Sequence, residues 1–308
     1  MKLESASDRD CLFFGDSPLE HQKKEHIKGV AYILIAALLW GCIGPVAKIA
    51  FSQGLAPLEV AFWRALIGWA FFACHAVLIK KMGIQTHDLP LILVFALICV
   101  TGFYGSYQLA VNLGGAAKAS VLLYTAPAWV ALMALVFLGE KITRQTIAGI
   151  IACMAGVILI SISNGNIGGH SFSWAGIFFG LMAGFTYALY FIFGKKLFPR
   201  YQAVTVFSWI LILGAFSLIP FIEFSAPTKT SWFALIFLGF LSTYLAYFFY
   251  ARGLVRLRAS QAAVVATMEP VVAAFLAYLF WQENLGIWGY TGALLIISGV
   301  IIQTVKRT

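Results

Sequence analysis

The sequence predicts an all-α integral membrane protein whose ten transmembrane helices form two inverted five-helix repeats. Of its 308 residues, 61% are hydrophobic and only 11% are charged, whereas a soluble domain carries about 25% charged residues. The apolar runs are long enough to cross a bilayer, about 20 residues each, and they do not alternate with polar residues. They therefore indicate helices and not the strands of a barrel. In addition, the second half of the chain repeats the first.

Ten apolar segments are separated by stretches with loop chemistry, such as QGLAP at 53–57 and SAPT at 225–228. Residues 1–27 are polar and of mixed charge, so we expect a flexible cytoplasmic tail there. The predicted spans are residues 28–49, 58–79, 89–110, 116–138, 143–163, 174–194, 203–222, 231–251, 259–281 and 284–304.

The net charge of +9 does not indicate nucleic-acid binding, because the basic residues fall in short loops between apolar segments. If the N-terminus is cytoplasmic, 17 of the 21 Lys and Arg residues lie on the cytoplasmic side. The positive-inside rule then predicts that both termini are cytoplasmic. The five cysteines include no CxxC pair, and four lie inside apolar segments. We expect small buried side chains there, not disulfides or metal ligands.

The two halves, residues 28–163 and 174–305, are copies of one unit. Each half contains five spans, an odd number, so the second copy enters the membrane upside down. Inverted repeats with proline-interrupted helices at matching positions indicate alternating access, with the substrate near the midplane between the halves. The glycines repeat at a seven-residue step within each half and predict close helix packing. At a shift of 143 residues, the matching pairs are Pro127/Pro270, Glu140/Glu283, Gly149/Gly292, Gly156/Gly299, Tyr104/Tyr247 and Tyr107/Tyr250. At a shift of 147 residues, the matching pairs are Gly29/Gly176 and Lys48/Lys195.

The span at 259–281 carries a carboxylate close to its middle, Glu269, followed directly by Pro270. A charge at that depth costs about 2–3 kcal/mol even on lenient insertion scales. Pro270 removes a backbone donor and crowds the carbonyl of Ala266, which weakens the helix at the same level. Pro127 should do the same in the first half. An ionisable group beside a broken helix predicts a binding site for a polar solute.

Four stretches carry a resemblance to a known family: APAWVALMALVFLGEKIT (126–143), GIIACMAGVILI (149–160), MEPVVAAFLAYLFWQEN (268–284) and GALLIISGVIIQ (292–303). Each half resembles an EamA unit of the drug/metabolite transporter superfamily. Arg64 matches an Arg typical of the second span, while WQE at 281–283 departs from the usual Leu-Gly-Glu. The resemblance covers about residues 28–305. It implies a ten-helix carrier of small metabolites in the bacterial cytoplasmic (inner) membrane, often an exporter of amino acids.

Glu269 has two interpretations. It would be a counter-ion for a cationic or zwitterionic substrate or a proton-coupling group, since burial favours its neutral form. Alternatively, it is a structural partner of another buried polar group such as Arg64. We expect a structural or gating role for Arg64, with a substrate carboxylate or the interface as its other partners. Lys48 and Lys118 should extend to the interface, and Glu140 and Glu283 should be interfacial charges at helix ends.

Aromatic residues in the middle of the spans are candidates for lining a cavity, where their rings can bind cations. They are Trp40, Tyr104, Tyr107, Tyr187 and Tyr247.

No HExxH, Gly-x-Ser-x-Gly or Walker motif is present, so we expect neither an enzyme nor an ATP-driven pump, and no cofactor or metal. The sequence predicts a secondary transporter that exports an amino acid or related zwitterion, with protons as a candidate coupling ion. The alternative is an uptake carrier for a larger cation, such as S-adenosylmethionine or a nucleoside-like compound. A channel or membrane-embedded enzyme is the different-class alternative. We expect membrane lipid to surround the protein, and we expect the protein to be a monomer or a homodimer.

Overall fold

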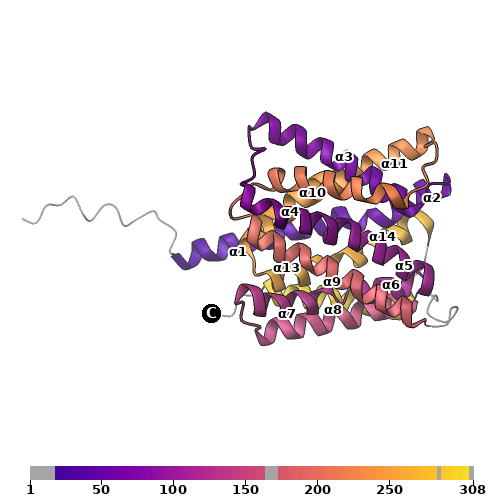
Figure 1. Ribbon diagram of the computed structural model, residues 1–308. Coiled ribbons are helices and arrows are strands. Elements are labelled where there is room, and N and C mark those ends of the chain that lie inside the picture. Colours follow the sequence, from indigo (N-terminus) through magenta and orange to yellow (C-terminus); the bar gives the residue numbers. More distant parts are fainter. Residues whose placement is uncertain (1–17, 164–172, 283–285, 305–308) are drawn as a thin grey trace, which may run out of the picture.

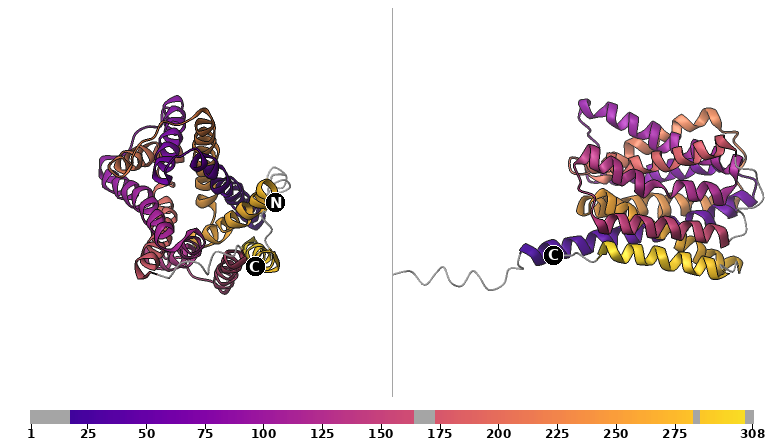
Figure 2. Two further views of the ribbon diagram at one scale, coloured as in Figure 1. Left: turned by 90° about the vertical axis from the view of Figure 1, so that its right-hand side faces the viewer. Right: turned by 90° about the horizontal axis from the view of Figure 1, so that it is seen from below.

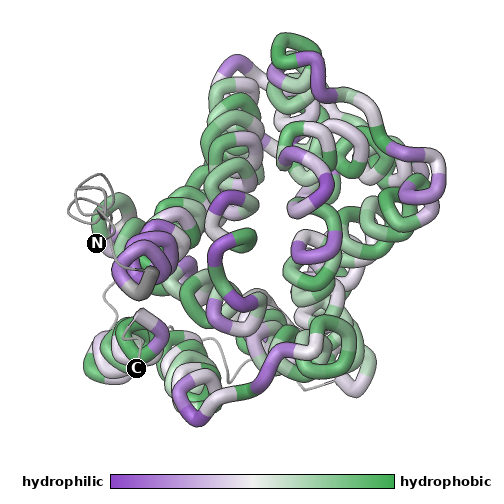
Figure 3. The backbone as a smooth tube through the Cα atoms, turned by 90° about the vertical axis from the view of Figure 1, so that its left-hand side faces the viewer, coloured by the Kyte–Doolittle hydropathy of each residue, from purple (hydrophilic) through white to green (hydrophobic). Residues whose placement is uncertain are grey.

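The computed structural model describes residues 18–163, 173–282 and 286–304, and these residues form helices without strands. Ten of the described helical segments are long and apolar enough to cross a membrane. The fold class expected from the sequence is therefore confirmed. The helices run side by side in one bundle (Figure 1). Hydrophobic residues cover their lengths, and hydrophilic residues gather near their ends (Figure 3).

Several spans are built from more than one helical piece. The first half contains α1 (Pro18–Gly41), α2 (Ile43–Ser52), α3 (Pro57–Leu78), η2 (Thr86–Asp88), α4 (Leu89–Phe95), η3 (Ala96–Gly102), α5 (Phe103–Gly114), α6 (Ala116–Leu123), α7 (Ala126–Leu138) and α8 (Arg144–Ser163). The second half contains α9 (Trp174–Leu197), α10 (Ala203–Leu218), η4 (Ile219–Phe221), α11 (Lys229–Gly239), η5 (Phe240–Leu245), α12 (Ala246–Arg256), α13 (Ala259–Ala266), α14 (Met268–Trp281) and α15 (Gly286–Thr304).

The first helix starts at Pro18, ten residues before the predicted start of the span, and projects beyond the other helices (Figure 1). The sequence after Pro18 is rich in Glu, Gln and Lys, which are good helix formers. Glu25 accepts from Lys28 Nζ and from Arg256 Nε, each at 2.8 Å, so this turn is tied to α12. The part of the expected flexible tail from residue 18 onward is thus helical, and residues 1–17 lie outside the described residues, as does Glu283.

The two halves pack on each other with the symmetry that the repeat implies. Helix α1 packs on α12 of the second half, and the corresponding helix α9 packs on α5 of the first. The last helices of the two halves, α8 and α15, lie side by side at one edge of the bundle (Figure 2). A methyl group on Gly156 would lie 2.5 Å from the carbonyl oxygen of Gly292, and the reverse distance is also 2.5 Å. The close packing predicted for these glycines is confirmed.

Two wide π-helical turns, η3 and η5, occupy matching positions in the two halves. Such turns release a backbone carbonyl from the regular helical ladder and are frequent at functional sites. In η5 the hydroxyl of Thr243 donates to the carbonyl of Leu238, five residues earlier, at 2.9 Å. A methyl group on Gly68 would lie 2.6 Å from Thr243 Cγ2. Helix α3 therefore passes very close to this turn.

Matching spans are interrupted before their prolines. One break lies at Tyr124 and Thr125, between α6 and α7, and the other at Thr267, between α13 and α14. Pro127 and Pro270 lack the N–H that would continue the ladder, so the backbone bends just before them. Threonine hydroxyls donate hydrogen bonds to backbone carbonyls at both breaks. Thr125 Oγ1 donates to Leu122 O at 2.6 Å, and Thr267 Oγ1 donates to Val264 O.

Candidate functional site

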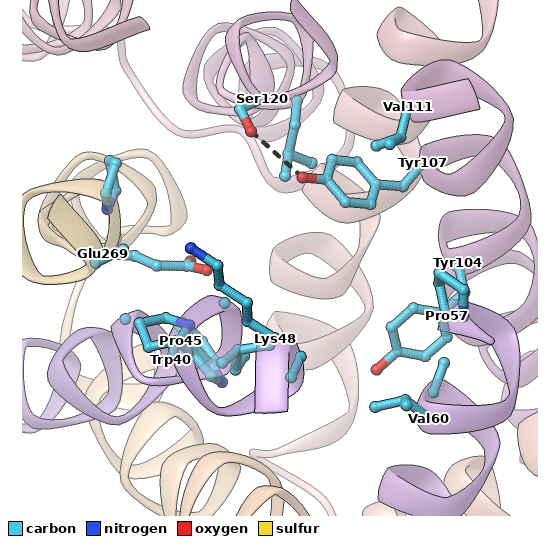
Figure 4. Close-up of a pocket in the computed structure, with 18 of the residues that line it drawn as sticks. Trp40, Pro45, Lys48, Pro57, Val60, Tyr104, Tyr107, Val111, Ser120 and Glu269 are labelled. Carbon is cyan, nitrogen blue, oxygen red and sulfur yellow. Dashed lines mark hydrogen bonds between the residues drawn. The ribbon is translucent and has the colours of Figure 1, made fainter. Parts of the chain in front are cut away.

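A cavity of about 640 Å³ lies between the two halves. Residues of α1, α2, α3, α5, α6, α8, α9 and α14 line it, together with residues of the span that holds η5. The lining includes most of α2 and the first turns of α3, so the cavity lies toward the end of the bundle away from Thr304 and the start of α1. Figure 4 shows part of its wall.

Glu269 lies in the first turn of α14, directly after the break at Thr267. Its side chain is partly exposed and lines the cavity. Tyr124, from the matching break in the first half, also lines the cavity, and its hydroxyl lies close enough to interact with the Glu269 carboxylate. Lys48, on α2, also lines the cavity, and its amino group points toward Glu269 (Figure 4). Lys48 was expected to extend to the interface, but in the structure its side chain lies on the cavity wall.

Arg64 reaches into the bundle from α3 and is only 8% exposed. Its Nε donates to Thr243 Oγ1 at 2.9 Å, and its guanidinium lies 5.5 Å from the centre of the Tyr104 ring. Arg64 also interacts electrostatically with Glu269. The cavity is thus lined by a buried cation and a carboxylate. The wide turn at η5 matters here, because it presents the Thr243 hydroxyl that holds Arg64 in place.

All five aromatic residues expected at a cavity line this one: Trp40, Tyr104, Tyr107, Tyr187 and Tyr247. Phe103 joins them and stacks on Tyr187 with ring centres 5.5 Å apart. The Tyr107 hydroxyl shares a 3.3 Å hydrogen bond with Ser120 Oγ (Figure 4). The structure therefore brings the predicted rings together with Glu269, Arg64 and Pro270. Pro127 is not on the wall but buried in α7.

The sequence did not single out Tyr124, Lys48 or Ser120 as site residues, although all three line the cavity. The repeat contains a signal for Tyr124, since this residue lies at the break that matches Thr267. Lys118 was expected at the interface, but it is buried, 6% exposed, on α6 where this helix packs against α9. Among the described residues, no group of three or more His, Cys, Asp or Glu side chains could hold a metal ion.

We expect Thr243→Val to lower the free energy of unfolding by about 1–3 kcal/mol. Valine keeps the shape of the side chain but leaves Arg64 Nε–H buried without its acceptor. Ser242→Ala is the matched control, because Ser242 belongs to the same turn and donates to Leu39 O instead. Thermal unfolding of both purified variants checks this. Equal melting temperatures for the two would contradict the role given to Thr243.

The profile of the EamA-like transporter family matches the chain twice, at residues 27–162 and 174–305. An uncharacterized transporter of Archaeoglobus fulgidus is 31% identical over 286 residues, which cover 89% of this chain and 98% of that protein. An uncharacterized inner membrane transporter of Salmonella typhimurium is 26% identical and covers 89% and 94% of the two chains.

Two further comparisons concern substrate and fold. A probable terminal-alkyne amino-acid exporter of Streptantibioticus cattleyicolor is 25% identical over 285 residues, covering 89% of this chain and 93% of that protein. A crystal structure with 18% identity superimposes with a TM-score of 0.78 over 89% of this chain and 95% of the other, and thus has the same fold. The resemblance drawn from the sequence is confirmed: this multi-pass membrane protein belongs to the EamA-like transporter family.

Proposed function

We propose that this protein is a secondary transporter that moves an amino acid or a related zwitterion across the bacterial cytoplasmic membrane by alternating access. The observation that carries this proposal is the presence of Glu269 and Arg64, which interact electrostatically, on the wall of one aromatic cavity. The carboxylate provides a counter-ion for an ammonium group, and the guanidinium provides one for a carboxylate. A zwitterion satisfies both charges at once.

The cavity wall also favours a solute with an apolar or flat body. Trp40 and the four predicted tyrosines supply apolar ring faces, while their polar atoms allow hydrogen bonds. The amino-acid exporter of Streptantibioticus cattleyicolor supports both this class of solute and the direction of export, as a relative at 25% identity.

With both termini in the cytoplasm, the cavity of this structure faces outward, because it lies away from the described chain ends. Glu269 would then exchange its bound solute for a proton. A carboxylate inside the membrane is stabilised by binding either a cation or a proton, and this competition couples the two movements.

The alternative is uptake of a larger cation, such as S-adenosylmethionine or a nucleoside-like compound. The volume of the cavity, about 640 Å³, favours this second candidate, since cavities of roughly 300–1,000 Å³ hold drug-sized ligands. The tyrosine rings around Glu269 would bind such a cation by their faces.

A proteoliposome assay with labelled amino acids, amines and S-adenosylmethionine, with and without an imposed pH gradient, tests the proposal. We expect gradient-driven accumulation of an amino acid and trans-stimulated exchange, which a channel does not show. Transport of S-adenosylmethionine alone would select the alternative. Flux without trans-stimulation would contradict a carrier mechanism.

A further inference from the structure

Between the cavity and the end of the bundle at which α1 begins and α15 ends, the bundle is filled by aromatic side chains. We call Trp40, Tyr190, Tyr247, Tyr250 and Phe207 the aromatic barrier. Each is at most 4% exposed. Tyr190 and Tyr247 stack with ring centres 5.8 Å apart, and Phe207 and Tyr247 stack at 4.8 Å. The rings of Trp40 and Tyr250 are tilted to each other, with centres 5.5 Å apart. The aromatic barrier separates the cavity from the closed end.

Three polar atoms in the aromatic barrier have no hydrogen-bond partner in this conformation: Trp40 Nε1 and the hydroxyls of Tyr190 and Tyr250. Tyr250 is 1% exposed, and its hydroxyl has no hydrogen-bond partner. A buried hydroxyl without a partner is unfavourable, and phenylalanine would fill the same space without that cost. The hydroxyl of Tyr250 must therefore be explained by another conformation of the protein.

The repeat shows which conformation that is. Tyr250 matches Tyr107, which lines the open cavity, at the shift of 143 residues. The Tyr107 hydroxyl has Ser120 as its partner, but the residue of the second half that matches Ser120 is Ala263. Tyr250 therefore has the same hydroxyl as Tyr107, but the second half has no hydroxyl at the position that matches Ser120. In an inverted repeat, exchanging the conformations of the halves gives Tyr250 the place that Tyr107 has now.

The closed end is fastened by Glu140, two residues after the end of α7. Its carboxylate accepts from the backbone N–H of Ala259 at 2.7 Å and from the hydroxyl of Ser260 at 3.2 Å. These groups begin α13, so Glu140 ties α7 of the first half to α13 of the second. Lys195, on α9, lies close enough to interact electrostatically with Glu140. The expectation of a merely interfacial charge is wrong for this residue, because a charged group that caps a helix of the other half joins the two halves.

We propose that the end of the transport path that is closed in this structure opens in the other conformation. Tyr250 is the residue there that contacts the solute, and Glu140 is the clasp that keeps this end closed. This inference rests on the proposed function. When the clasp opens, the aromatic barrier separates, and the Tyr250 hydroxyl donates to the carboxylate of the zwitterion as the solute enters from that side. The cost of the unpartnered hydroxyl then helps to destabilise the closed state.

The clasp is tested without any solute. Cys99 is 0% exposed and interacts electrostatically with Tyr190 and Tyr250. Its rate of labelling therefore reports on access to the closed end of the path. A variant that retains only Cys99 is reconstituted, and a membrane-impermeant maleimide is added on the side that carries the termini. Glu140→Gln should raise the rate of labelling about tenfold, the size expected for loss of a charged hydrogen bond.

Glu25→Gln is the matched control, because Glu25 is a carboxylate at the same end that pairs with Lys28 and Arg256 but does not touch α13. Its labelling rate should equal that of the parent. Equal rates for Glu140→Gln and the parent, or an equal increase for Glu25→Gln, would overturn the clasp. This result does not depend on which solute, if any, the parent protein transports.

Tyr250→Phe tests the contact and is not expected to disturb folding, because the hydroxyl has no partner in this structure. Its melting temperature should equal or exceed that of the parent. The KM for solute offered on the side of the termini should rise about fivefold, while the KM on the other side stays unchanged. Tyr107→Phe should show the opposite pattern. Unchanged KM values on both sides for Tyr250→Phe, in a protein that transports, would overturn the contact and leave the proposed function intact.

Discussion

Glu269→Gln should fold and insert normally but transport solute at less than about a tenth of the parent rate. Glutamine has the same size and remains polar beside Tyr124, so the wall of the cavity keeps its shape. It cannot balance the positive group of the solute, and it cannot bind and release a proton. A charged hydrogen bond contributes about 1.5–3 kcal/mol, which corresponds to about a tenfold to hundredfold change in affinity. Initial rates in proteoliposomes between about pH 5.5 and 8, the range around neutral pH, measure the effect.

Two variants control for the loss of an acidic group. Glu223→Gln removes an exposed carboxylate in the loop after η4 and should transport like the parent. Glu269→Asp keeps the charge on a shorter side chain and should recover part of the activity. Parent rates for Glu269→Gln at saturating solute across the whole pH range would show that this carboxylate neither binds nor couples.

Gly156→Val should cause a large loss of stability. Its added Cβ would lie 2.5 Å from Gly292 O and 2.7 Å from Ile296 Cγ1, so α8 and α15 must separate. Overpacking of a close contact costs about 1–3 kcal/mol, and more where backbone must move. We therefore expect a lower melting temperature and a reduced yield of monodisperse protein in detergent.

Gly105→Val is the matched control for this substitution. Gly105 also lies inside a membrane-spanning helix, α5, but a Cβ there meets no atom within 4 Å. The same exchange should change stability only by the difference in helix propensity, less than about 1 kcal/mol. If both variants unfold at the same temperature, the close approach of α8 and α15 does not limit stability.

The spans could be predicted because the bilayer imposes a local rule: about 20 consecutive apolar residues and complete internal hydrogen bonding. The site residues on the broken span were visible for a similar reason. Glu269 is costly wherever its helix lies in the membrane, and Pro270 disturbs the ladder whatever packs against it. Both features follow from the residue and its immediate neighbours.

Other residues were misjudged because their surroundings come from distant segments. Lys48 and Lys118 were expected at the interface on the basis of depth alone. The structure places Lys48 on the cavity wall and Lys118 under α9. Glu140 looked like a helix-end charge until its partners, Ala259 and Ser260, were located more than a hundred residues away. Depth in the membrane can be estimated from the sequence, but the direction in which a side chain points cannot.

The sequence by itself determined the ten spans, the repeat, the matching breaks and the acidic residue at one of them, since hydropathy and proline chemistry act within a single helix. Only the tertiary structure decided that Arg64 is held by Thr243, that Tyr124 meets Glu269, and which end of the cavity is closed. These features depend on how each helix is rotated about its axis and on the contacts between the two halves. Two inverted repeats of one fold can adopt either of two arrangements, so their order along the chain does not state which end is open.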